Sequence, residues 1–292
     1  MLLASATPSL WAFWTWRFEI PLLLVVLTVV LYWIGCRRTY TPERSRGAQV
    51  RRSVCFYTAM AVAFFALCPP FHWYADRLFW VHMIQHVLLM MVAAPLVVLS
   101  RPWIRLFRVL PLGSRRTLAR AFSDKGHLGP LSSVGHWLGT PPVSLALFAI
   151  VLLGWHVPVL FNATLTSSLL HALEHTMFIA VAIMFWKQVI PSPPLKIVLG
   201  QWGRVMYITA AMAVSWALSL WLALSTHPLY AHYAQLSSRP GGISAMTDQQ
   251  LAAGVMWVPG SVTFVIVLLV YFVGWLAPSS DSGPGQALAG EH

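Results

Sequence analysis

The 292-residue chain is 58% hydrophobic and only 9% charged, and it contains 15 Trp and 15 Phe. Soluble domains carry about a quarter charged residues, so this composition excludes an ordinary soluble protein and indicates a polytopic membrane protein. The chain has 19 Lys and Arg against 8 Asp and Glu. Because these basic residues flank apolar segments and form no recognition motif, they argue against nucleic-acid binding.

Seven apolar segments are each long enough to cross a hydrocarbon core of ~30 Å as a helix. None of them alternates as a barrel strand does, so we expect an all-α fold with seven transmembrane helices embedded in a lipid bilayer. In chain order the segments are Phe18–Cys36, Ser53–Pro70, Leu78–Leu99, Val143–Phe161, Ser168–Ile190, Val205–Leu224 and Leu251–Ala277. We expect residues 1–277 to form a single transmembrane domain and residues 278–292 to form a disordered cytoplasmic tail.

Basic residues gather in the loops after the first, third and fifth segments, which lie on one side of the membrane. By the positive-inside rule this side is cytoplasmic, so the N-terminus is predicted outside and the C-terminus inside. The residues are Arg37, Arg38, Arg44, Arg46, Arg51 and Arg52; Arg101, Arg105, Arg108, Arg115, Arg116, Arg120 and Lys125; and Lys187, Lys196 and Arg204.

Histidines form a layer in the outer third of the third, fourth and fifth predicted helices. A lone polar residue in a membrane helix is often an interhelical contact worth about 1 kcal/mol. Five at one depth are harder to explain in this way, because each uncompensated polar group in hydrocarbon costs several kcal/mol. The five residues are His82, His86, His156, His171 and His175.

The spacing within this layer points to metal chemistry. His82 and His86, and likewise His171 and His175, are four residues apart, so each pair lies on one helix face and can chelate one ion. Imidazole suits zinc, copper and iron. Glu174 is the only carboxylate well inside any of the segments, and it is a candidate ligand, a partner that orients an imidazole, or a proton carrier.

Sulfur ligands are a second possibility, because thioethers favour cuprous copper, although methionine is also ordinary packing material. Of the methionines around these helices we include Met256 as a candidate ligand and Met246 as a residue at the mouth of the site. His72 follows the outer end of the second helix, and Gln85 lies between His82 and His86 as hydrogen-bonding support.

The outer loop before the seventh helix ends at Asp248. Two interpretations stay open for this residue: it caps the seventh helix, or it is the acid at the mouth of the site.

Four stretches carry a resemblance to a known family: VHMIQHVLLMMVAAPLVVLSRP, LLGWHVPVLFNATL, LLHALEHTMFIAVAIMFWKQVI and SAMTDQQLAAGVMWVPG. In this order they resemble the CtaG-type multi-pass assembly factors of caa-type cytochrome c oxidase. The resemblance implies a protein of the bacterial-type plasma (inner) membrane that is not an enzyme and that handles copper for the oxidase on the outer side. Its partner would be an oxidase subunit or a copper chaperone. The residues to which it points are His82, Gln85, His86, His156, His171, Glu174, His175, Asp248, Gln249, Gln250, Met256 and Trp257.

Three classes of function stay open on the residues alone. A metallochaperone would hold and release copper at a site open to the outer loop. A membrane-embedded zinc hydrolase would use three histidines, with Glu174 or Asp248 as general base. A haem protein of electron transfer would take axial histidines from the third and fifth helices. We expect copper as the bound species, with zinc or haem as the alternatives.

Overall fold

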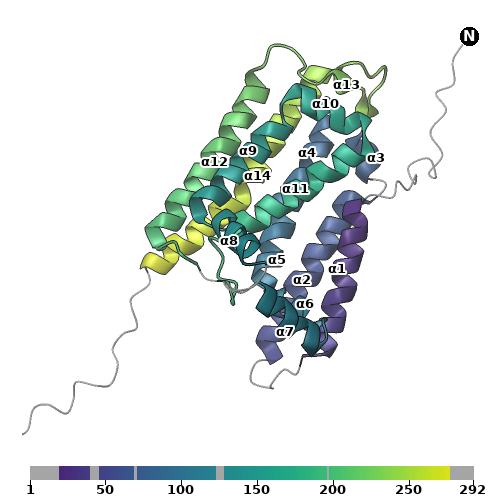
Figure 1. Cartoon of the computed structure of the whole chain (residues 1–292). Coiled ribbons are helices and arrows are strands. Elements are labelled where there is room, and N and C mark those ends of the chain that lie inside the picture. The colour runs from purple at the N-terminus through teal and green to yellow at the C-terminus, as the bar shows by residue number, and fades with distance from the viewer. Residues whose placement is uncertain (1–19, 40–45, 69–70, 123–127, 196, 277–292) are drawn as a thin grey trace, which may run out of the picture.

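The computed structural model describes residues 20–39, 46–68, 71–122, 128–195 and 197–276, and these residues form helices and connecting turns without a strand (Figure 1). The predicted tail at 278–292 lies outside the described residues. The longer helices are α1 (Ile20–Arg37), α2 (Arg46–Leu67), α9 (Pro141–Trp155), α11 (Ser168–Trp186), α12 (Gln201–Leu224) and α14 (Ala245–Leu276). A further long segment is built from α4 (Phe79–Val87), the π-helix η2 (Leu88–Ala93) and α5 (Ala94–Ser100). The short helices are α3 (Phe71–Ala75), α6 (Trp103–Arg108), α7 (Leu112–Ala121), α8 (Gly129–Leu138), α10 (Pro158–Thr166), α13 (Ala231–Ala234) and η3 (Pro240–Gly242).

In the described part of the chain, five helical segments are long and apolar enough to cross a membrane. They are Arg46–Leu67, Phe79–Ser100, Ser168–Trp186, Gln201–Leu224 and Ala245–Leu276. Gly129–Leu138 and Pro141–Trp155 add a sixth span if this pair, bent by 73°, is counted as one, and Leu22–Arg37 is a shorter apolar helix. The protein is thus an all-helical, multi-pass membrane protein, whereas the total of seven spans and the orientation stay predictions.

The predicted fourth helix, Val143–Phe161, is wrong at its outer end, because α9 stops at Trp155 and His156 is its C-cap. The chain turns there, and α10 begins at Pro158 with Val157 in extended conformation. Proline has no N–H to continue a helix and disfavours helical geometry in the preceding residue. His156 therefore lies at a helix end, where its side chain faces inward.

Two other boundaries also differ from the prediction. Arg46, Arg51 and Arg52 lie within α2 and not in the preceding loop. The last helix begins at Ala245, six residues before the predicted start, because the Ser244 hydroxyl accepts a hydrogen bond from Thr247 N (3.0 Å) and so caps the first turn.

The helices form an elongated bundle in which α1 and α2 lie on one side and α12 and α14 on the other, with α4, α5 and α11 between them (Figure 1). The short helices α3, α10 and α13 lie at one end of the bundle, and α6 and α7 at the opposite end. The middle is filled by buried aromatic side chains: Phe185 stacks on Tyr207, and Trp186 on Phe264. The packing ties α11 to α12 and α14.

The π-helix η2 follows directly after His86 in the span that carries the first histidine pair. A wide turn, together with Pro95 in the next helix, removes ordinary backbone hydrogen bonds, and in lipid the freed carbonyl groups need other donors. Trp186 Nε1 donates to Met90 O (2.9 Å), and Thr263 Oγ1 donates to Met91 O (2.7 Å). Side chains of α11 and α14 thus hold the irregular turn in place.

Candidate metal centre

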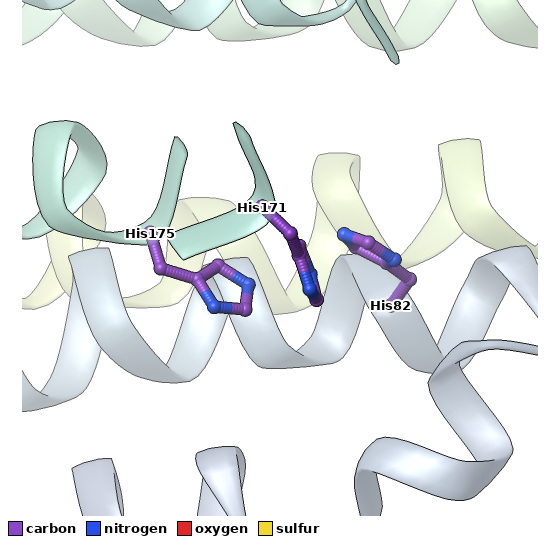
Figure 2. A group of neighbouring side chains, drawn as sticks. All are labelled: His82, His171 and His175. Carbon is purple, nitrogen blue, oxygen red and sulfur yellow. The ribbon is translucent and has the colours of Figure 1, made fainter. Parts of the chain in front are cut away.

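Six buried histidines lie next to one another beside the end of the bundle where α3, α10 and α13 are found. Centroids of neighbouring rings are separated by 4.3 Å for His171 and His175 and by 6.2 Å for His86 and His156. The His82 ring is 5.3 Å from that of His171, and Figure 2 shows the rings of His82, His171 and His175 pointing toward one another from α4 and α11. The six are His72, His82, His86, His156, His171 and His175. The structure therefore brings together the five histidines predicted as ligands and places beside them His72, which was expected at the mouth of the site and whose ring is 5.4 Å from that of His171.

The protonation of His82 follows from its neighbours. The Tyr233 hydroxyl donates to Ala75 O (2.7 Å) and lies 3.1 Å from His82 Nδ1. Burial raises the pKa of Tyr233 well above its usual range, so the phenol keeps its proton. Since that proton is used at Ala75, the hydroxyl accepts from His82 Nδ1–H, and the lone pair of His82 is left on Nε2.

His82 Nε2 lies beside one further candidate ligand, and that ligand lies beside another. It lies 3.0 Å from His86 Nε2, which in turn lies 3.8 Å from Glu174 Oε1. Glu174 is fully buried, and among the described residues neither of its oxygens has a hydrogen bond of ordinary geometry. The nearby Thr164 hydroxyl donates to the Phe161 carbonyl instead (2.8 Å). A buried carboxyl group beside two imidazoles is thus left to interact with a cation or a proton.

Two overlapping sets of three residues each present ligand atoms within 4.8 Å of one another: His82, His86 and Glu174, and His82, His171 and His175. His82 belongs to both sets. Around a tetrahedral ion with bonds of 2.0 to 2.1 Å, the ligand atoms are separated by about 3.3 Å. The His82 to His86 nitrogen separation is already this short, and the other groups reach it by small movements.

Asp248 lies neither at the mouth of the site nor at the cap of its own helix, which corrects both interpretations. Its carboxylate is fully buried and accepts hydrogen bonds from Phe79 N and Trp80 N, each at 3.0 Å. These amides belong to the first turn of α4, where the N-cap Leu78 offers no side-chain acceptor. Asp248 of α14 therefore caps the helix that carries His82 and His86.

The glutamines expected to support the site make other contacts. Gln85 donates to Ala66 O (2.7 Å), so its side-chain amide joins α4 to α2. Gln249 accepts from Leu229 N (2.8 Å) and donates to Leu222 O (3.1 Å), so it holds the loop between α12 and α14. Gln250 is exposed, because the helical rotation that buries Asp248 and Gln249 turns it outward.

Of the other residues predicted near the site, some lie beside the histidines and others do not. Trp257 is exposed, and its ring lies 6.1 Å from that of Trp216 on the outer face of α14 and α12, away from the histidines. Met246 is partly exposed in the first turn of α14. Met256 is buried and lines a small cavity beside His86 and Met83. His156 also reaches Met83, with Nε2 3.4 Å from its Sδ.

Tyr233 is a functional candidate that the sequence did not single out, and Met83 is one of the nearby methionines that we interpreted as packing and not as a ligand. The sequence shows Met83 next to His82 in HMIQH. It does not show that the Met83 side chain meets His156, because that contact depends on where α9 ends. Tyr233 lies in the loop between α12 and α14, and no local pattern distinguishes it from Tyr230 three residues earlier.

Comparison with known proteins gives the chain a family. Uncharacterized proteins of Mycobacterium bovis and Mycobacterium tuberculosis are each 24% identical to it over 269 residues, which is 89% of this chain and 39% of theirs. The chain thus spans well under half the length of the curated relatives it matches. No solved structure matches it. The model of the cytochrome c oxidase caa3 assembly factor family matches residues 30–277, and the chain belongs to this family (Caa3_CtaG).

Proposed function

We propose that the protein holds a copper ion as cargo in its histidine cluster and passes it to a cytochrome c oxidase during assembly. The observation that carries the proposal is the convergence of His82 Nε2, His86 Nε2 and Glu174 Oε1 in the bundle interior. Membership of an oxidase assembly family supports an oxidase as the recipient of the copper ion. In this role the protein is not an enzyme, and it acts in a bacterial-type plasma (inner) membrane.

The donor set fits copper on chemical grounds. Imidazole nitrogens bind copper well, and the Tyr233 hydroxyl keeps His82 in the tautomer that exposes the Nε2 lone pair. Glu174 compensates the charge of an ion in a medium where an isolated charge is costly. These residues hold the ion, orient its ligands and exclude water from it.

The shared ligand His82 supports release as well as binding. An ion held by His82, His86 and Glu174 can move to the set of His82, His171 and His175 without losing its bond to His82. The His171 ring adjoins that of His72 on the short helix α3 at the end of the bundle. This order of rings describes a path toward an oxidase subunit or a copper chaperone on the outer side.

The alternative functions receive less support. A haem needs a flat space beside its axial rings, whereas the His82 ring packs against that of Phe161 (5.2 Å) and the His86 ring against that of Phe178 (4.6 Å). For a zinc hydrolase, a substrate must reach the metal, and Glu174 is fully buried. Metal analysis separates zinc from copper directly.

The test is the affinity of the purified protein for copper. Replacing His86 by Ala removes a direct ligand, so affinity should fall by more than the 10- to 100-fold typical of residues that only orient ligands. Met184 lies on α11 beyond the histidines, and Met184→Ala removes a partly buried side chain as a packing control. If His86→Ala and Met184→Ala bind copper as tightly as the original protein, the histidines are structural and the proposal is wrong.

A further inference from the structure

We infer that a second, sulfur-containing subsite adjoins the histidine cluster and takes copper as the cuprous ion. It consists of Met83 Sδ and His156 Nε2, together with the small cavity that Met256 and His86 line. The inference rests on the proposed copper function and adds the oxidation state and a second position for the ion.

The first argument is a contact between two acceptors. His156 Nδ1 lies 2.7 Å from Leu152 O, and a carbonyl only accepts, so the proton of the neutral ring is on Nδ1. Nε2 therefore carries a lone pair, and it faces the Met83 sulfur at 3.4 Å. A thioether has no proton to donate, and both side chains are buried. A doubly protonated ring would supply the proton, but its N–H would form only a weak hydrogen bond to the thioether, which does not offset the cost of burying a full charge. A soft cation satisfies both lone pairs.

The second argument is the separation of these two atoms. With metal bonds of about 2.0 Å to nitrogen and about 2.3 Å to sulfur, atoms 3.4 Å apart subtend an angle of about 100° at the ion. This is close to tetrahedral. The separation of the two atoms thus matches that of two ligands of one ion.

The third argument is the composition of the adjoining cavity. It has a volume of about 40 Å³, and its lining includes His86, Ser215 and four methionines: Met83, Met90, Met91 and Met256. Methionine alone is ordinary packing. Here the thioethers come from α4, η2 and α14, and they line a small, partly open space beside the imidazole of His86. Thioether ligands select Cu(I) over divalent ions.

His86 connects the two subsites. It lines the methionine cavity, its Nε2 lies 3.0 Å from His82 Nε2, and its ring is 6.2 Å from that of His156. The nitrogen and oxygen set on one side of His86 suits divalent ions, and the nitrogen and sulfur set on the other side suits Cu(I). The ion's oxidation state decides which side it occupies.

The test compares Cu(I) with Cu(II) on the same purified protein. Met83→Leu and Met256→Leu keep the apolar volume and remove the sulfur, and Met184→Leu is the matched control on α11. We expect Cu(I) affinity, measured anaerobically by competition with a chromophoric chelator, to fall at least about tenfold in Met83→Leu and Met256→Leu. Cu(II) affinity should be unchanged in all three variants.

X-ray absorption of the unaltered protein loaded with Cu(I) provides a readout that needs no variant. It should show copper–sulfur scattering near 2.3 Å, which Met83→Leu weakens. Cu(I) bound by nitrogen alone, or unchanged Cu(I) affinity in both leucine variants, overturns the inference while leaving the histidine site standing. An unaltered protein that binds neither oxidation state refutes the proposed function itself, and the subsite with it.

Discussion

At the scale of single residues, the candidate site depends on where a few protons lie. Tyr233 donates to Ala75 O and accepts from His82, and these two hydrogen bonds leave the His82 lone pair facing His86. Partners that fix the tautomer of a metal-binding histidine raise its affinity for the ion. Under the proposed copper function, the Tyr233 hydroxyl therefore belongs to the site as a residue that orients a ligand, although it is no ligand itself.

Tyr233→Phe should lower copper affinity about 10- to 100-fold, because His82 Nδ1–H loses its acceptor and the ring is free to turn. Competition titration of the purified protein measures the change. Tyr230→Phe is the matched control: Tyr230 is also buried, and it donates to a carbonyl, His156 O at 3.0 Å. It should cost about 1 kcal/mol of stability and little copper affinity. Equal losses of affinity in both variants would show that tautomer control by Tyr233 is unimportant.

At the scale of elements, α4 is held by a carboxylate from α14. The amides of Phe79 and Trp80 lie in the first turn of α4, where backbone N–H groups have no acceptor within the helix. Asp248 accepts a hydrogen bond from each of them. Because these contacts are buried, they are stronger than the same bonds in water. This cap fixes the depth and rotation of α4, and with them the positions of His82 and His86.

Asp248→Ala should lower the free energy of unfolding by roughly 3 kcal/mol or more, since two charge-assisted hydrogen bonds are lost and two buried amides stay without an acceptor. Copper affinity should fall as well, because α4 loses its anchor. Gln250→Ala, on the exposed face of the same helix, should change stability by less than about 0.5 kcal/mol. Thermal unfolding in detergent measures both. If the two variants unfold at the same temperature, the cap does not stabilise α4.

Helix geometry explains which parts of this arrangement the sequence could predict. The two histidines of each pair are four residues apart and so lie on one helix face. The two pairs therefore contact each other once these faces of α4 and α11 pack together. Pro158 also indicates a helix break, but the apolar segment continues through it, and we therefore predicted one uninterrupted helix. The partner of Asp248 was not readable, because it lies 168 to 169 positions away in the chain. The π-helix likewise depends on Trp186 and Thr263, which no local pattern connects to Met90 and Met91.

At the scale of the whole molecule, the two ends of the bundle differ chemically. The histidine cluster lies near α3, α10 and α13, whereas α6 and α7, which carry Arg105, Arg108, Arg115, Arg116 and Arg120, lie at the opposite end (Figure 1). If the basic end is cytoplasmic, as the charge distribution predicts, the cluster opens outward. A protein with this polarity can present copper to the outer face of an oxidase without carrying the ion across the membrane.

Oxidase activity in membranes that lack the native gene tests this arrangement as a whole. Cells that produce His86→Ala or His175→Ala should assemble an oxidase of low activity, although both variants reach the membrane in normal amounts. Met184→Ala should restore full activity, because its side chain is distant from the histidines along α11. Copper added to the medium should partly rescue the histidine variants, since mass action replaces a cargo carrier but not a structural subunit. Full oxidase activity with either histidine variant at normal copper would instead assign these imidazoles to contacts between helices, and the protein would assist assembly by some means other than holding the metal.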